Sequence, residues 1–82
     1  MSCYNFMAVL INHRSKMAPK VQEILTNHGC AIKMRLGLHE VSDVCSEEGV
    51  ILMQVCGEDD QIKTLQSDLN ELPGVKAKTI SI

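Results

Sequence analysis

The sequence predicts an α+β domain of the ferredoxin-like βαββαβ class, with a four-stranded antiparallel sheet and two helices on one face. Three observations predict this class. Apolar runs and helical stripes follow one another as strand, helix, strand, strand, helix and strand along the 82 residues. The first and third runs are apolar without alternation, as central strands covered on both faces are. The length suits one core, so we expect residues 1–82 to form a single domain.

The first two elements are a strand and a helix. Tyr4–Ile11 is short and mostly apolar, and its length favours a strand over a helix. From Ala18 to His28 the apolar residues recur at helical spacing, at Met17, Val21, Ile24, Leu25 and His28. Pro19 suits the first turn of such a helix, and Gly29 is the expected left-handed residue at its end.

The next segment predicts an exposed strand and a long hairpin loop. Cys30–His39 alternates apolar and polar residues, which is typical of a half-exposed edge strand. Lys33 and Arg35 would discourage stray pairing at that edge. Glu40–Gly49 is acidic and polar, and it is longer than the usual hairpin loop, which indicates mobility or a function.

The last third predicts a strand, a helix and a strand. Val50–Cys56 is a nearly continuous apolar strand, and Asp59 or Asp60 can cap the helix that follows. The apolar stripe of that helix consists of Ile62, Leu65, Leu69 and Leu72. Pro73 and Gly74 end it, and Val75–Ile82 forms the final strand.

Charge and composition exclude several classes of function. The formal net charge is −2, and the chain has one Tyr, one Phe and no Trp, so direct nucleic-acid binding is not expected. The N-terminal residues lack the pattern of a secretory signal, and no apolar stretch is long enough to cross a membrane. We therefore expect a cytoplasmic protein in which the four cysteines are reduced.

Catalysis has little support in the sequence. Motifs of hydrolases, P-loop enzymes, zinc proteases and dinucleotide-binding enzymes are all absent. Glu47, Glu48, Asp59 and Asp60 form adjacent pairs, which in loops and helix caps usually means solvation. Two helices that cover one sheet face leave little chain for a water-excluding pocket. We expect a protein that is not an enzyme, and the sequence identifies no cofactor.

Several short motifs resemble one family of small proteins. They are Arg35-Leu36-Gly37-Leu38, Gly49-Val50, Leu72-Pro73-Gly74-Val75-Lys76 and Glu23-Ile24-Leu25 followed by Gly29. Together they resemble the iron-only hydrogenase system regulators, stand-alone domains related to ACT domains and to the sensory domain of the nickel-responsive repressor. The resemblance covers nearly the whole chain and implies an ACT-like fold and a regulatory role. The sequence departs from the family pattern in a longer acidic loop, Glu40–Glu48, and in His39 where Pro is expected.

The kinship with a nickel sensor directs attention to the histidines and cysteines. His39 and Cys45 on the long hairpin, with His28 and Cys30 beside the helix-to-strand turn, are candidate metal ligands. None of them forms a C-x-x-C, an H-x-H or an i, i+4 helical pair. The competing interpretation is a capping His28, a solvated His39 and cysteines that act as small apolar residues.

The turn before the first helix is the candidate effector site. It contains Asn12, His13, Arg14, Ser15 and Lys16. Free N–H groups and the helix dipole attract anions to such a place, and the two basic side chains would add charge. ACT-like domains bind small effectors near this loop, so the resemblance implies the same position. A solvated basic turn is the alternative.

Both orientations along the two central strands are apolar, although the helices can cover only one sheet face. One set is Phe6, Ala8, Leu10, Val50 and Leu52, and the other is Met7, Val9, Ile11, Ile51, Met53 and Val55. The exposed set would be too apolar for a monomer, so we expect a homo-oligomer, a dimer or tetramer. We assign the second set to its interface.

The predicted function is a regulatory or sensory ACT-like module that oligomerises and binds a small-molecule or metal effector, in an iron-only hydrogenase system if the resemblance holds. Two alternatives remain open. One is a ligand-free structural or assembly partner of an enzyme system, and the other is a metal-carrying accessory protein for maturation.

Overall fold

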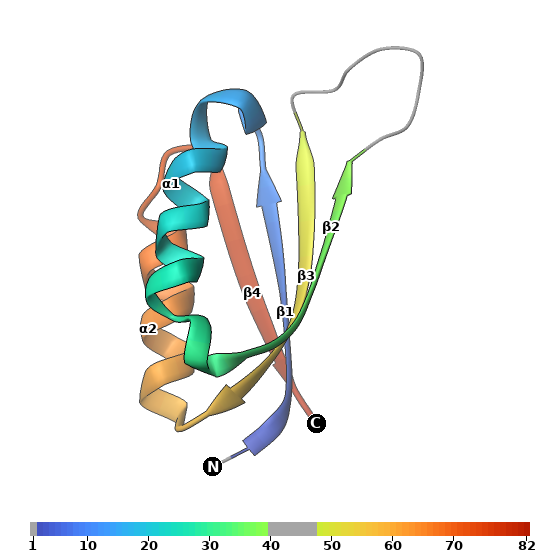
Figure 1. The fold of residues 1–82 in the computed structure, drawn as a ribbon, viewed down its shortest axis with the longest axis vertical. Helices are drawn as coiled ribbons and strands as arrows, with labels where there is room; N and C mark the ends of the chain where they lie inside the picture. The colour runs from blue at the N-terminus through green and yellow to red at the C-terminus, as the bar shows by residue number, and fades with distance from the viewer. Residues whose placement is uncertain (1, 40–47) are drawn as a thin grey trace.

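The computed structural model describes residues 2–39 and 48–82 and arranges them in two layers (Figure 1). The elements in chain order are β1 (Ser2–Ile11), α1 (Arg14–Asn27), the short 3-10 helix η1 (Gly29–Ala31), β2 (Ile32–His39), β3 (Gly49–Gly57), α2 (Asp59–Asn70) and β4 (Val75–Ser81). The four strands pair antiparallel in the order β2-β3-β1-β4, and both helices lie on the same side of the sheet. This confirms the predicted βαββαβ class and the central position of the first and third strands.

The core lies between the sheet and the helices. Alternate residues of β1, β3 and β4 point into it, and they meet the apolar stripes of α1 and α2. Val9, Val55, Leu65 and Leu69 are completely shielded from solvent. The one buried polar side chain among the described residues, Asn5, donates from its Nδ2 to the Val55 carbonyl at 3.2 Å and accepts from the Ser81 hydroxyl at 2.7 Å.

The structure corrects which face of the two central strands is exposed. The residues that were assigned to an oligomer interface from the sequence are 0–8% exposed and belong to the core: Met7, Val9, Ile11, Ile51, Met53 and Val55. They cannot contact another subunit in this fold because the helices cover them. The premise that one set faces away from the helices is confirmed, but the exposed set is the other one.

Helix α1 begins earlier than its apolar stripe predicts. Its first residue is Arg14, and Met17 is buried in the core one turn later. Pro19 therefore lies inside the helix and not in its first turn. Gly29 is not the left-handed end residue, since among the described residues only Gly74 has a positive φ, 74°. His28 ends the helix, and Gly29 opens η1.

The junctions before α2 and before β4 lie at opposite ends of the domain (Figure 1). Glu58, not Asp59 or Asp60, precedes the helix, and its backbone N–H donates to Gln61 Oε1 at 2.9 Å. After the helix, Gly74 adopts the left-handed conformation that glycine tolerates. Its carbonyl accepts the Asn12 N–H at 2.8 Å, which ties the turn before α1 to the turn before β4.

The cysteines differ from the expectation of reduced thiols. Cys3 and Cys56 lie opposite each other near the ends of β1 and β3 and form a disulfide. Cys56 is buried, as a core cysteine would be, whereas Cys30 is free and exposed. Cys45 and most of the acidic loop lie outside the described residues, so the interpretation of that loop stays a prediction.

Candidate functional site

A cavity of about 310 Å³ opens where the C-terminal end of α1 and η1 meet the first turns of α2. Polar residues predominate among those that line it, which are Asn27, His28, Cys30, Ala31, Asp60, Gln61 and Thr64. The two sides are far apart in sequence, and the α1–α2 packing brings them together. The volume is at the lower end of the range for small-molecule sites.

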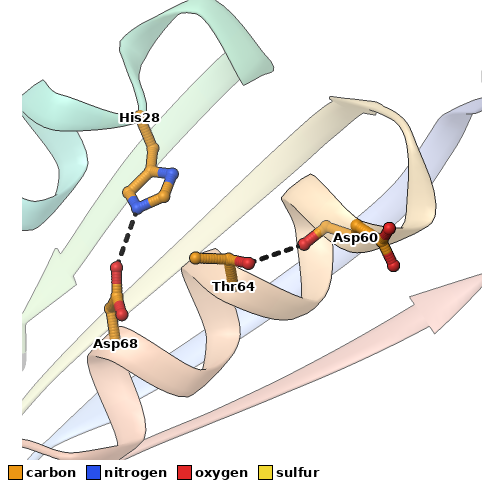
Figure 2. A network of polar contacts seen from close by, with 4 residues as sticks. All are labelled: His28, Asp60, Thr64 and Asp68. Carbon is orange, nitrogen blue, oxygen red and sulfur yellow. Dashed lines mark hydrogen bonds and ion pairs between the residues drawn. The ribbon is translucent and has the colours of Figure 1, made fainter.

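Two hydrogen bonds organise this end of the domain (Figure 2). His28 Nε2 lies 3.0 Å from Asp68 Oδ2 and joins the end of α1 to α2. The His28 side chain is 21% exposed and that of Asp68 is 43% exposed, so solvent weakens the pair. The Thr64 hydroxyl donates to the Asp60 carbonyl at 2.8 Å, which directs the oxygen of Thr64 along the helix surface.

The polar side chains of the cavity wall include both hydrogen-bond donors and acceptors. Asp60 lines the cavity from the exposed first turn of α2, whereas Asp68 lies outside the lining and pairs with His28. Gln61 uses its Oε1 to accept the Glu58 N–H, which leaves its NH₂ group as a donor. Asp60 is the acidic residue among those that line the cavity, and a compact molecule that carries an ammonium group would complement its charge.

The candidate metal ligands are not brought together. His28 and Cys30 share the cavity, but the backbone of His39 lies at the other end of β2, about 20 Å from Ile32 along an extended strand. One site that joins all four residues is therefore excluded. Among the described residues, no three histidine, cysteine or carboxylate side chains converge to hold a metal ion. Because Cys45 is outside these residues, a site built on His39 and Cys45 stays a prediction.

The predicted effector loop lies at the opposite end of α1 from this cavity. Asn12 and His13 are exposed and precede the helix, and the segment from Arg14 to Lys16 forms its first turn rather than a loop. The His13 carbonyl accepts the Lys16 and Met17 N–H groups at 3.1 and 2.8 Å. This arrangement leaves the anion-binding prediction open.

The sheet face away from the helices is more extensively apolar than the two central strands alone indicate. On this side, the exposed large apolar side chains of the strands are Phe6, Leu10, Met34, Leu36, Leu52 and Ile80, at 37–67% exposure. We call this surface the bare sheet face. Tyr4 and Ile82, the other exposed large apolar residues described, lie at its end, where the Ile82 N–H donates to the Tyr4 carbonyl.

Comparison with known proteins places the chain in a family. The family model described as TM1266-like, iron-only hydrogenase system regulator, matches residues 4–79. The chain belongs to this TM1266-like family. No curated protein sequence matches it significantly.

Solved structures place this TM1266-like protein among ACT-like folds. The uncharacterized protein TM1266 from Thermotoga maritima is 23% identical, with a TM-score of 0.84 over 95% of this chain and 94% of that one. The ACT domain of the GTP pyrophosphokinase of Chlorobium tepidum is 13% identical, with a TM-score of 0.70 over 93% and 95%. A protein described as PII-like, from Thermus thermophilus, is 11% identical, with a TM-score of 0.65 over 95% and 85%. At these identities the likeness is one of fold.

The family match confirms the resemblance that the sequence motifs indicated.

Neither helix of the described residues combines the length and the apolar character that a membrane crossing requires.

Proposed function

We propose that this TM1266-like protein is a non-catalytic regulatory module of an iron-only hydrogenase system that responds to a small amino compound held in the His28 cavity. The family match supports the regulatory role, and the fold is shared with an ACT domain. The observation that carries the effector proposal is the cavity itself, which joins α1, η1 and α2 at one end of the domain.

The chemistry of the cavity selects the class of effector. Asp60, Gln61 and Thr64 line the cavity from the first turns of α2, and their side chains carry a carboxylate, an amide and a hydroxyl. A primary ammonium group can donate to the Thr64 hydroxyl oxygen, and its charge complements that of the Asp60 carboxylate. The volume limits the effector to a compact molecule such as an amino acid.

A thermal-shift screen tests this proposal, since a ligand that binds only the native state raises the melting temperature. Free amino acids are expected to raise it, whereas their N-acetylated forms, which lack the ammonium group, are not. Nucleotides and divalent metals complete the panel. Stabilisation by a metal and by no amino compound would contradict the proposed class of effector.

A matched pair of variants locates the site. Asp60→Asn removes the negative charge of a residue that lines the cavity and is expected to weaken binding about tenfold or more, because the charge that complements the ammonium group is lost. Asp59→Asn makes the same change at the neighbouring position, which lines a separate cavity with Lys63 and Gln66. Both variants lose the same charge near the start of α2, so equal effects on binding would place the effector elsewhere.

A further inference from the structure

The bare sheet face carries an ordered pattern of side chains. The strand register places them in three rows across the sheet. The first row runs Met34, Gln54, Phe6 and Ile80; the second runs Leu36, Leu52, Ala8 and Lys78; the third contains Val50, Leu10 and Lys76. Apolar residues fill every described position except Gln54 and the two lysines, and both lysines belong to the edge strand β4.

We propose that a second copy of this chain covers the bare sheet face by face-to-face stacking of the two sheets. The described structure places every exposed large apolar side chain on this face or at its end, and none on the helices. Such a concentration on one face is typical of an interaction surface and not of scattered surface residues.

The size of the face agrees with a reversible dimer. Four strands spaced about 4.8 Å apart and three rows about 6.8 Å apart give a flat footprint of about 400 Å² per subunit. The side chains corrugate this footprint, so the accessible area is larger. Specific interfaces bury about 800 Å² on each partner, and smaller ones are usually transient. We therefore expect a transient dimer that dissociates on dilution.

The charges on the face select the orientation of the second copy. Lys76 and Lys78 both lie on β4, and the face has no acidic residue among the described positions. A twofold axis parallel to the strands places β4 of one subunit over β2 of its partner, which keeps the lysines of the two subunits apart. Lys78 then faces the partner's Leu36, and its aliphatic stem can cover that residue while the ammonium group reaches the rim.

The same axis produces complementary shapes at the centre of the face. A hollow of about 410 Å³ lies on this face, and Phe6, Ala8 and Leu52 are among the residues that line it. Ala8 pairs with Leu52 in the register, so the twofold axis places Ala8 opposite the partner's Leu52. The twofold symmetry repeats this contact, so that Ala8 of each subunit faces Leu52 of the other, and a small side chain meets a large one both times.

Sedimentation velocity of the untagged protein between about 5 and 500 μM tests the proposal. We expect a species of twice 9.1 kDa that dissociates on dilution. Ala8→Glu, at an exposed position, is expected to give a folded monomer throughout this range, with folding checked by circular dichroism. Ser67→Glu, the matched control on the exposed surface of α2, is expected to keep the dimer.

A second variant tests the orientation. Leu36→Asp places a carboxylate opposite the partner's Lys78, so we expect a dimer that weakens as salt is raised. Loss of this dimer at low salt would overturn the proposed orientation.

Other results would overturn the stacking itself. A wild-type monomer at all concentrations would do so, as would a dimer unaffected by Ala8→Glu, which would place the contact elsewhere. Flotation of the monomer with phosphatidylglycerol vesicles, but not with phosphatidylcholine vesicles, would assign the face to anionic lipid and would also refute a second copy.

Discussion

Reduction of the Cys3–Cys56 disulfide is expected to lower the stability of this protein strongly. The bridge joins residues 53 positions apart, so it closes a loop that contains most of the chain. A loop of about 54 residues corresponds to about 4 kcal/mol of chain entropy removed from the unfolded state at 25 °C. In a domain of this size that free energy corresponds to a fall in Tm of about 15–30 °C.

The assay compares urea unfolding with and without a phosphine reductant, followed by circular dichroism. Cys3→Ala is expected to reproduce the effect of reduction and to be insensitive to the reductant, because the bridge is already absent. Cys56→Ala is expected to cost more, since it also removes a buried sulfur from the core. Cys30→Ser is the control: this cysteine is free and exposed, and its replacement is expected to change stability by less than about 0.5 kcal/mol.

Two results would refute this reasoning. The sequence has four cysteines, so alkylation of the denatured protein is expected to add at most two groups before reduction and four after it. Addition of four groups without a reductant would show that the bridge is absent from the purified protein. A reductant that leaves the urea midpoint unchanged, although mass spectrometry shows the bridge broken, would refute the loop-closure magnitude.

The remaining predictions concern the two ends of the domain. A double-mutant cycle of His28→Ala and Asp68→Ala, measured by urea unfolding, is expected to give a coupling of about 0.2–1 kcal/mol; a coupling above about 2 kcal/mol would contradict a pair this exposed. Gly74→Ala is expected to destabilise the domain by about 1–2 kcal/mol because φ is positive there, whereas Gly37→Ala, where an added Cβ meets nothing within 4 Å, is expected to cost less; equal losses would argue against strain at Gly74.

The order and type of the elements could be predicted because each has a clear local period. The stripe of α2 supplies three fully or nearly buried residues, Ile62, Leu65 and Leu69, and all three were predicted. The start of α1 was missed because the turn before it is polar and Pro19 resembles a first-turn residue. Met17, the first residue of the predicted stripe, is buried in the core as expected, but the helix begins three residues before it, at Arg14, where the sequence has no apolar signal.

The cavity could be predicted only in part. His28 and Cys30 were identified as candidates by residue type, but their partners on α2 depend on how the two helices pack. Asp60 was interpreted as a capping residue, and Thr64 carried no signal at all. Spacing along the chain does not predict the distance between the end of α1 and the start of α2, about 30 residues later. The cavity is therefore visible only in the folded structure.

The disulfide was missed because the lack of a secretory pattern favoured reduced cysteines, and the pairing itself depends on a shift in strand register. Met7 pairs with Met53, and an unbroken ladder would place Cys3 opposite Gly57. Ser2 pairs with Gly57 instead, because the register shifts between Ser2 and Asn5. That irregularity brings Cys3 opposite Cys56. The apolar pattern of neither strand indicates such an irregularity in the register.

Alternation of apolar and polar residues could not identify which face of β1 and β3 packs against the helices. A period of two identifies the buried face only when the other face is polar, and on β1 and β3 both faces are apolar. The deciding signal lies on β4, where Val75 and Ala77 alternate with Lys76 and Lys78. Lys76 and Lys78 lie on the side of the sheet away from the helices. Because Ala8 pairs with Lys78 and Leu10 with Lys76, these two residues of β1 lie on the same side. The pattern of β4 was visible in the sequence, but its register against β1 comes only from the folded sheet.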